Sequence, residues 1–175
     1  MKRPIGFFLA FLLCFLFQPN AKAGEREDRL VDSAVRGDIN GVRTLLDQGV
    51  DVNGVGHGTT PLIVGVEGNH VDVVLLLLSR GADVNQRTEM DGPPLWCSAF
   101  KGYVEIARIL IAKGADVNEK DNLSDKTPLM KANEVLAKGK IDLDDSGHVI
   151  HKPLTTDERK PYLEIVNMLK AAGAR

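Results

Sequence analysis

The residues best suited to chemistry lie in one segment, 139–160, near the C-terminal end of the chain. Oxygen-bearing side chains recur there at alternate positions, Asp142, Asp144 and Ser146, as at the start of a calcium-binding loop. The twelfth position of such a loop requires a bidentate glutamate, and this chain has Pro153 there. We therefore expect a hairpin or a solvated loop, with calcium binding as the alternative.

The same segment has the pattern of a β-hairpin and two histidines. Ile141 and Leu143 precede an Asp-Asp-Ser-Gly turn, and Val149 follows it, which predicts two short paired strands. His148 and His151 are residue types that bind zinc, but a zinc site needs at least three protein ligands and no third is evident. We therefore expect solvated surface histidines and no metal.

No other part of the sequence presents a catalytic set. Cys97 falls at a core-facing helical position, and a buried thiol is unreactive. The chain has no local Ser/His/Asp or Cys/His motif and no glycine loop that would cradle a phosphate. We therefore expect no enzyme activity and no cofactor. The rival hypothesis is a metal-responsive or hydrolytic accessory protein that uses the segment 139–160.

The elements that position these residues follow from an internal repeat. A Gly-x-Asp-Val-Asn motif occurs at 49–53, 81–85 and 114–118, so that its asparagines are 32 and 33 residues apart. A Pro-Leu motif, preceded by Thr or Pro, occurs in step with it at 60–62, 93–95 and 127–129. Two short apolar stretches separated by a turn lie between the two series. Two coincident series with this spacing predict stacked helical repeats.

The chemistry of each motif agrees with pairs of helices. Thr60 and Thr127 are suited to cap a helix whose first residue is proline. Gly81 and Gly114 are suited to end the second helix, because glycine adopts the left-handed conformation without strain. We expect the asparagine that closes each Asp-Val-Asn motif to bond locally within the turn.

These motifs resemble those of the ankyrin repeat, and the resemblance covers about Glu27 to Ala174. It implies an all-α solenoid of about four helix-turn-helix units joined by β-hairpin-like loops. The first and last units are atypical, as capping units are: the first lacks Thr-Pro-Leu, and the second helix of the last arrives late, near Tyr162. The implied units are about 27–54, 55–87, 88–121 and 122–175, with an insertion at about 139–160.

The resemblance also implies a concave face that binds protein partners. The variable positions of the family fall on the loops at His57, Thr59, Arg87, Glu89, Met90, Leu123 and Lys126, and on the first helices at Arg36, Glu67, Phe100, Lys101 and Glu134. The residues predicted to bind the partner are His57, Arg87, Glu89, Met90, Glu67, Phe100 and Lys101, together with Trp96. Trp96 replaces the histidine that usually follows Thr-Pro-Leu, and Phe100 stands at a position that is usually polar. Aromatic residues dominate binding hot spots. Packing against the neighbouring unit is the alternative role for both aromatic residues.

The N-terminal residues have the pattern of a signal peptide. Lys2 and Arg3 precede an uncharged apolar run, 5–17, and Ala21-Lys22-Ala23 is a small-x-small cleavage pattern. We expect cleavage after Ala23 and a mature domain at 24–175 in the periplasm or secreted beyond it. The alternative is an uncleaved anchor, although the run is shorter than the roughly 20 apolar residues of a membrane span.

The charge of the mature chain restricts its partners. Removing residues 1–23 takes away three basic residues and no acidic one, which leaves 19 basic against 24 acidic residues and a net charge of −5. Binding to nucleic acid or to an anionic membrane surface relies on Lys and Arg, so we expect neither. The only cysteine left is Cys97, so a fold without an internal disulfide is expected. We expect a monomer that binds a protein, as a stabiliser or assembly factor or as an immunity-type inhibitor.

Overall fold

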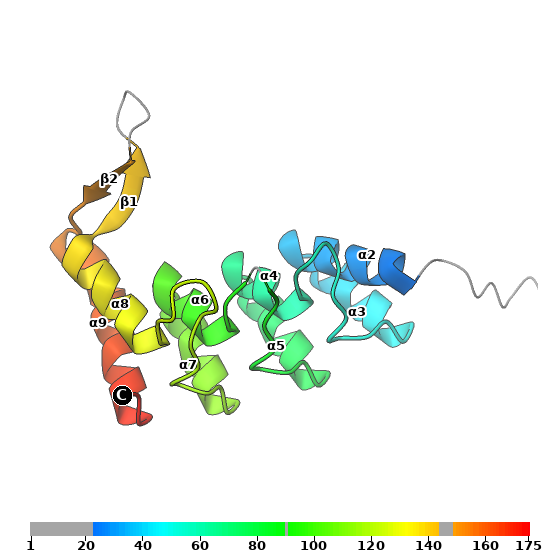
Figure 1. The fold of residues 1–175 in the computed structure, drawn as a ribbon. Coiled ribbons are helices and arrows are strands. Elements are labelled where there is room, and N and C mark those ends of the chain that lie inside the picture. Colours follow the sequence, from blue (N-terminus) through cyan, green and yellow to red (C-terminus); the bar gives the residue numbers. More distant parts are fainter. Residues whose placement is uncertain (1–22, 90, 144–148) are drawn as a thin grey trace, which may run out of the picture.

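The computed structural model describes residues 23–89, 91–143 and 149–175, with the backbone alone described for 23, 141–143 and 149–150. Within these ranges eight helices follow one another as four successive pairs, and a two-stranded hairpin lies inside the last pair. Figure 1 shows the pairs stacked in a single row, with the hairpin projecting from the end of the row. The predicted all-α solenoid is confirmed.

The bounds of the elements repeat along the chain. The first three pairs are α2 (Ala23–Val35) with α3 (Ile39–Asp47), α4 (Pro61–Glu67) with α5 (Val71–Ser79), and α6 (Pro94–Lys101) with α7 (Val104–Ala112). The last pair is α8 (Pro128–Lys138) with α9 (Thr156–Ala171), and the strands between them are β1 (Lys140–Leu143) and β2 (Val149–Lys152).

The helix ends are set by the residues that the sequence analysis assigned to them. The Thr60 hydroxyl accepts a hydrogen bond from the Ile63 N–H at 3.2 Å at the start of α4. The Thr127 hydroxyl likewise accepts from the Met130 N–H at 3.3 Å at the start of α8. Gly81 and Gly114 follow the second helices with φ of 88° and 87°, in the left-handed region that favours glycine. The predicted caps are confirmed.

The asparagines of the repeat motif do not bond as predicted. The local turn is made by the preceding aspartate, as when Asp51 Oδ1 accepts from the Asn53 N–H at 2.9 Å. The asparagine side chain instead accepts a backbone N–H of the next unit. These bonds join Asn53 to Asp83, Asn85 to Asp116 and Asn118 to Arg175, at 2.8–2.9 Å. The prediction of local bonding was wrong because the partners lie 30, 31 and 57 residues away and are brought close only by stacking.

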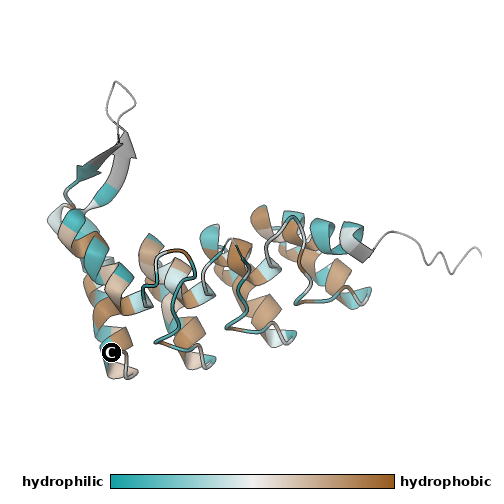
Figure 2. Ribbon diagram, in the orientation of Figure 1, coloured by the Kyte–Doolittle hydropathy of each residue, from teal (hydrophilic) through white to brown (hydrophobic). Residues whose placement is uncertain are grey.

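The hydrophobic core runs continuously between the units. Fully buried residues come from every unit, and they include Leu30, Leu62, Leu77, Leu95, Leu110 and Ile165. Small residues allow the close approach within a pair, since a Cβ added to Gly65 would lie 3.4 Å from Val73 Cγ1. Figure 2 shows apolar residues in the helices of each unit and mainly hydrophilic residues in the long loops. Each helix pair is therefore stabilised by its neighbours.

The last helix starts earlier than predicted. α9 begins at Thr156 rather than near Tyr162, so residues 156–160 belong to the helix and not to the insertion. Thr155 and Glu158 form a capping box, in which each side chain bonds the backbone N–H of the other residue. The prediction followed the apolar pattern, which starts only at Tyr162, whereas the first turn is polar and is defined by its cap.

The segment between α8 and α9 contains the predicted hairpin. β1 and β2 pair antiparallel, with Ile141 opposite His151 and Leu143 opposite Val149. The turn residues 144–148 lie outside the described residues.

The part of the chain that the structure describes contains no helix that is both long and apolar enough to span a membrane. Residues 1–22, which hold the expected signal peptide, lie outside it.

Candidate functional site

Two aromatic residues of α6 form the centre of the candidate site. Trp96 and Phe100 lie one helical turn apart, with ring centroids separated by 5.7 Å and planes inclined by 35°. Both are half-buried, and Trp96 packs against the edge of the core. The indole N–H of Trp96 is buried and has no acceptor among the described residues. Trp96 is therefore held by its ring contacts, and the packing role that the sequence analysis considered is confirmed, whereas its binding role stays a prediction.

Lysines from two adjacent units surround this pair. Lys131 of α8 lies with its Nζ 4.5 Å from the Phe100 centroid and 5.2 Å from the Trp96 centroid, within the range of a cation–π contact. Lys101 at the end of α6 lies 5.9 Å from the Phe100 centroid. The side chain of Lys131 is only 16% exposed. The fourth unit therefore supplies a partly buried positive charge to the aromatic pair of the third.

Glu134, one turn after Lys131 on α8, contacts Lys131 and two further lysines, Lys126 and Lys138. Its two carboxylate oxygens accept hydrogen bonds from Lys126 at 2.6 Å and from Lys138 at 3.0 Å, and Lys131 lies 3.6 Å away. The bonds from Lys126 and Lys138, followed by the charge of Lys131, lower the pKa of Glu134 from 4.5 to about 2. The carboxylate is thus ionised throughout the neutral pH range, and one acid orients three bases.

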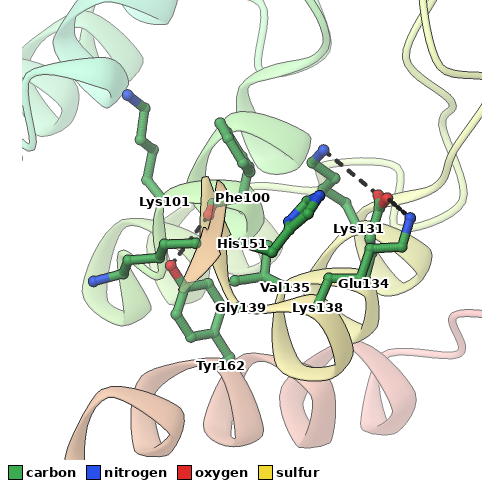
Figure 3. Close-up of a pocket in the computed structure, with 10 residues that line it drawn as sticks. Phe100, Lys101, Lys131, Glu134, Val135, Lys138, Gly139, His151 and Tyr162 are labelled. Atoms are coloured by element: carbon green, nitrogen blue, oxygen red, sulfur yellow. Dashed lines mark hydrogen bonds and ion pairs between the residues drawn. The ribbon is translucent and has the colours of Figure 1, made fainter. Parts of the chain in front are cut away.

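A pocket of about 330 Å³ lies beside Phe100, between α6, α8 and α9 and the base of the hairpin. We call it the lysine pocket. Its lining residues are Phe100, Lys101, Lys131, Glu134, Val135, Lys138, Gly139, Lys140, His151 and Tyr162. Figure 3 shows the Tyr162 ring beneath Phe100 and the charged side chains around the opening. The Tyr162 hydroxyl donates to the Phe100 carbonyl at 3.3 Å, which ties α9 to α6.

A second pocket, of about 300 Å³, shares Phe100, Lys101 and Lys131 with the first. We call it the loop pocket, because the loop before α8 closes it with Leu123, whose residue is 78% exposed. Glu67, at the end of α4, lines it from the second unit. Phe100 therefore stands between two hollows, and its neighbours come from three successive units.

Cys97 lines the loop pocket but is not a nucleophile. Burial, with a smaller contribution from the Glu67 carboxylate, raises the pKa of the thiol to about 12. The thiol donates to the Gly92 carbonyl at 3.7 Å, and the residue is buried as predicted. The thiolate that nucleophilic chemistry needs is therefore absent at neutral pH.

His57 lies apart from the aromatic pair. It is on the loop before α4 with a left-handed φ of 50°, and its N–H donates to Asp28 Oδ1 at 2.8 Å. Its ring lies 3.6 Å from Asp28 and 3.5 Å from Asp32, both on α2. His57 therefore joins the first two units.

The remaining predicted binding residues lie on the loop before α6. Arg87 donates to the Lys120 carbonyl at 3.3 Å and lies 3.7 Å from Glu119, so it connects successive loops. Glu89 is exposed. Met90 lies outside the described residues. The structure thus brings together Trp96, Phe100, Lys101 and Glu67, and it places His57, Arg87 and Glu89 on the loops.

Sequence reasoning missed Lys131, Lys138 and Tyr162 as parts of the site. One signal was available for the first of them. When the Pro-Leu motifs are aligned, Lys131 of the fourth unit is equivalent to Cys97 of the third. The fourth unit therefore has a charged residue at a position where the third has a buried one. Tyr162 had no such signal, because its contact with Phe100 joins residues 62 positions apart.

The metal hypotheses concern residues that the structure describes only in part. Asp144, Ser146 and His148 lie outside the described residues, and His151 lines the lysine pocket. Over the ranges 23–89, 91–143 and 149–175, no group of three or more His, Cys, Asp and Glu side chains is arranged to hold a metal ion.

Comparison with known families agrees with this architecture. A family described as ankyrin repeats (3 copies) matches residues 8–88, and the single ankyrin repeat matches residues 93–122. The chain belongs to the ankyrin-repeat family. Ankyrin repeats are protein–protein interaction modules and are generally non-catalytic. The helix pairs and the loops between them are thus a scaffold for binding a protein.

A mouse protein shares part of this scaffold. The 2-5A-dependent ribonuclease of Mus musculus is 38% identical over 72 residues, which are 40% of this chain and 10% of that protein. The chain therefore spans about a tenth of the length of this curated relative, and the likeness concerns ankyrin repeats.

Proposed function

We propose that the mature chain, residues 24–175, is a non-catalytic module of the cell envelope that binds a protein partner through Trp96, Phe100, Lys101 and Glu67. We call these four residues the aromatic surface. The observation that carries the proposal is the position of Phe100, half-exposed between two pockets and flanked by lysines.

This arrangement has the physical properties of a binding hot spot. An aromatic ring buries a large apolar area when a partner covers it, and it loses little conformational entropy because it has few rotatable bonds. The charged residues Glu67, Lys101 and Lys131 line the loop pocket beside the ring and form a polar rim that restricts which partners fit. A scaffold made of units that touch only their neighbours leaves such a flank open for recognition.

The location and the role of the protein are part of the proposal. The signal-peptide pattern of residues 1–23 supports export to the periplasm, or secretion beyond it. The net charge of −5 after cleavage supports a protein partner rather than nucleic acid or an anionic membrane. Within this function the module acts as a stabiliser or assembly factor for an exported protein, or as an immunity-type inhibitor, and as a monomer.

Affinity capture tests the binding function. Mature wild-type protein, the Phe100→Ala variant and a Leu75→Ala control are incubated with the envelope fraction of the source cells. Leu75 is a matched control, because it is also a large apolar residue, 43% exposed, but lies on α5. We expect the wild type and Leu75→Ala to retain the same partner and Phe100→Ala to lose it. Equal retention by all three proteins, or no specific partner, would contradict the proposal.

Intact-mass measurement tests the location. Protein isolated from the envelope should begin at Gly24. A full-length species that resists carbonate extraction would instead favour the uncleaved anchor.

A further inference from the structure

The lysine pocket has a composition that the aromatic surface alone does not explain. Lys101 closes α6, Lys131 and Lys138 lie two helical turns apart on α8, and Lys140 begins β1. Three different elements therefore contribute lysines to the lining of one pocket. Figure 3 shows Lys131 and Lys138 directed toward Glu134, and Lys101 on the far side of Phe100 from them.

These lysines carry more positive charge than their partners neutralise. Glu134 forms ion pairs with Lys126, Lys131 and Lys138, and Glu158 lies 3.3 Å from Lys140. Among the residues that line the pocket there are four lysines and one glutamate, Glu134, which is a formal surplus of three positive charges. The mature chain as a whole is negative, so this surplus is a local feature that attracts an anionic group.

The floor of the pocket is apolar. Val135 and Tyr162 are buried below the lysines, and Phe100 forms one wall. Gly102 allows this packing, because a Cβ at that position would lie 3.0 Å from the Tyr162 ring. An inorganic anion would make no apolar contact with this floor, so the ligand that fits combines an apolar group with negative charge.

The pocket is also continuous with the aromatic surface. Phe100, Lys101 and Lys131 line both the lysine pocket and the loop pocket, so a chain that covers Phe100 passes over both openings. The volume of about 330 Å³ lies at the lower end of the range for ligand pockets, which suits one side chain with its adjoining backbone.

We propose that the lysine pocket receives an acidic segment of the protein partner. An aromatic side chain of that segment lies on Val135, Tyr162 and Phe100, and the carboxylates of the flanking residues bind Lys101, Lys131 and Lys138. This inference rests on the proposed function, because it names the chemistry of the partner at the same site. The segment needs no fixed secondary structure, because flexible lysine side chains adapt to carboxylates at varied positions.

Synthetic peptides test this chemistry directly. The first is a blocked peptide that carries phenylalanine between glutamates. The second replaces its phenylalanine by alanine, and the third replaces its glutamates by lysines. Trp96 is the only tryptophan of the chain and shares Lys131 with the pocket, so its emission reports occupancy, and calorimetry gives the affinity. We expect saturable binding of the first peptide and binding at least about tenfold weaker for the other two.

Charge variants of the mature protein locate the peptide. Lys138→Glu and Lys101→Glu should each weaken the first peptide about tenfold, because an attraction becomes a repulsion. Lys113→Glu is the control, since Lys113 is exposed at the end of α7 and outside the pocket. It should change the affinity less than about threefold. Melting temperatures close to wild type show that each variant is folded. If Lys138→Glu does not fold, Lys101→Glu alone tests the assignment.

Several results would overturn the assignment. They are no binding of the first peptide, equal binding of all three peptides, or an equal effect of Lys113→Glu. Displacement of the peptide by inorganic polyphosphate at equal concentration would assign the pocket to phosphate groups instead.

Capture from the envelope fraction separates this inference from the proposed function. If wild type and Lys138→Glu retain the same partner equally well, the binding function stands and the assignment of the lysine pocket fails. If the acidic peptide binds as described but no envelope protein is captured, the chemistry of the pocket stands and the proposed function fails.

Discussion

The second and the last units of the solenoid contain the same Thr-Pro-Leu motif but differ in length, burial and charge. In the second unit, α4 and α5 have 7 and 9 residues, and every residue of α4 from Pro61 to Val66 is buried. In the last unit, α8 and α9 have 11 and 16 residues, are separated by a hairpin, and line a pocket with lysines. Within the described residues, the second unit contacts a unit on each side, whereas the last contacts only the third.

The number of neighbours explains the difference. A unit between two others must present an apolar surface to each, so the side chains between units are committed to stability. A terminal unit keeps one flank in solvent, and that flank tolerates longer helices, charges and an insertion. The aligned pair Cys97 and Lys131 illustrates this, because the thiol is buried in the third unit and the ammonium group covers an aromatic pair in the fourth. The comparison predicts that mutations of buried residues in the second unit change stability, and that mutations of the half-exposed side chains where the third unit meets the last change binding.

The largest effect is expected from Leu77→Ala in the second unit. Leu77 is fully buried on α5, and its truncation leaves a cavity in the core, which costs about 2–5 kcal/mol of unfolding free energy. Denaturant titration measures the loss. Binding of the partner per folded molecule should be unchanged, and a reduced affinity of the folded fraction would show that the second unit also shapes the binding site.

Phe100→Ala should have the opposite effect. Removal of the half-exposed ring should weaken binding of the partner by about 1–3 kcal/mol, as truncation of an interface anchor does. The melting temperature should stay close to wild type. If the variant instead melts earlier and binds normally per folded molecule, Phe100 belongs to the core of the stack. The recognition surface would then lie on the insertion or on the outer helices.

Acid should remove the stabilising effect of Glu134. The pKa of Glu134 is about 2 in the folded protein and 4.5 in its ordinary environment, so its contribution is complete above about pH 4.5 and is lost as pH falls toward 2. Wild type should therefore be more stable than Glu134→Gln at neutral pH, by about 1 kcal/mol because solvent partly screens the ion pairs. Unfolding free energies at several pH values should show this difference shrinking on acidification. A difference independent of pH would mean that Glu134 acts through packing.

The smallest effect on stability is expected from replacing the hairpin. Exchange of residues 140–152 for a short Gly/Ser turn should leave helical content and cooperative melting nearly unchanged, because the entropy of loop closure depends weakly on length. The matched control extends the replacement to Lys160 and removes the Thr155–Glu158 capping box, which should cost about 0.5–2 kcal/mol. Circular dichroism distinguishes the two. Loss of the melting transition in the shorter replacement would mean that the hairpin is part of the terminal cap.

Residues that act within one turn of the chain could be read from the sequence. Thr60 and Thr127 cap helices, and Gly81 and Gly114 end them, because their conformational preferences are local. The 33-residue spacing then fixed the family and the stacked architecture. The start of α9 was also readable, since Thr155 and Glu158 stand at the spacing of a capping box, but the apolar pattern alone misplaced it.

The candidate site depended on contacts between units. Phe100 and Trp96 were named from the repeat, but the lysine pocket arises because stacking brings α8 and α9 against α6, so that Lys131 covers the two rings and Tyr162 bonds the Phe100 carbonyl. The bond from Asn53 to the next unit has the same origin. Local preferences determined each helix pair. Only burial of the apolar faces between units, which fixes their register and distance, decided which side chains of different units meet.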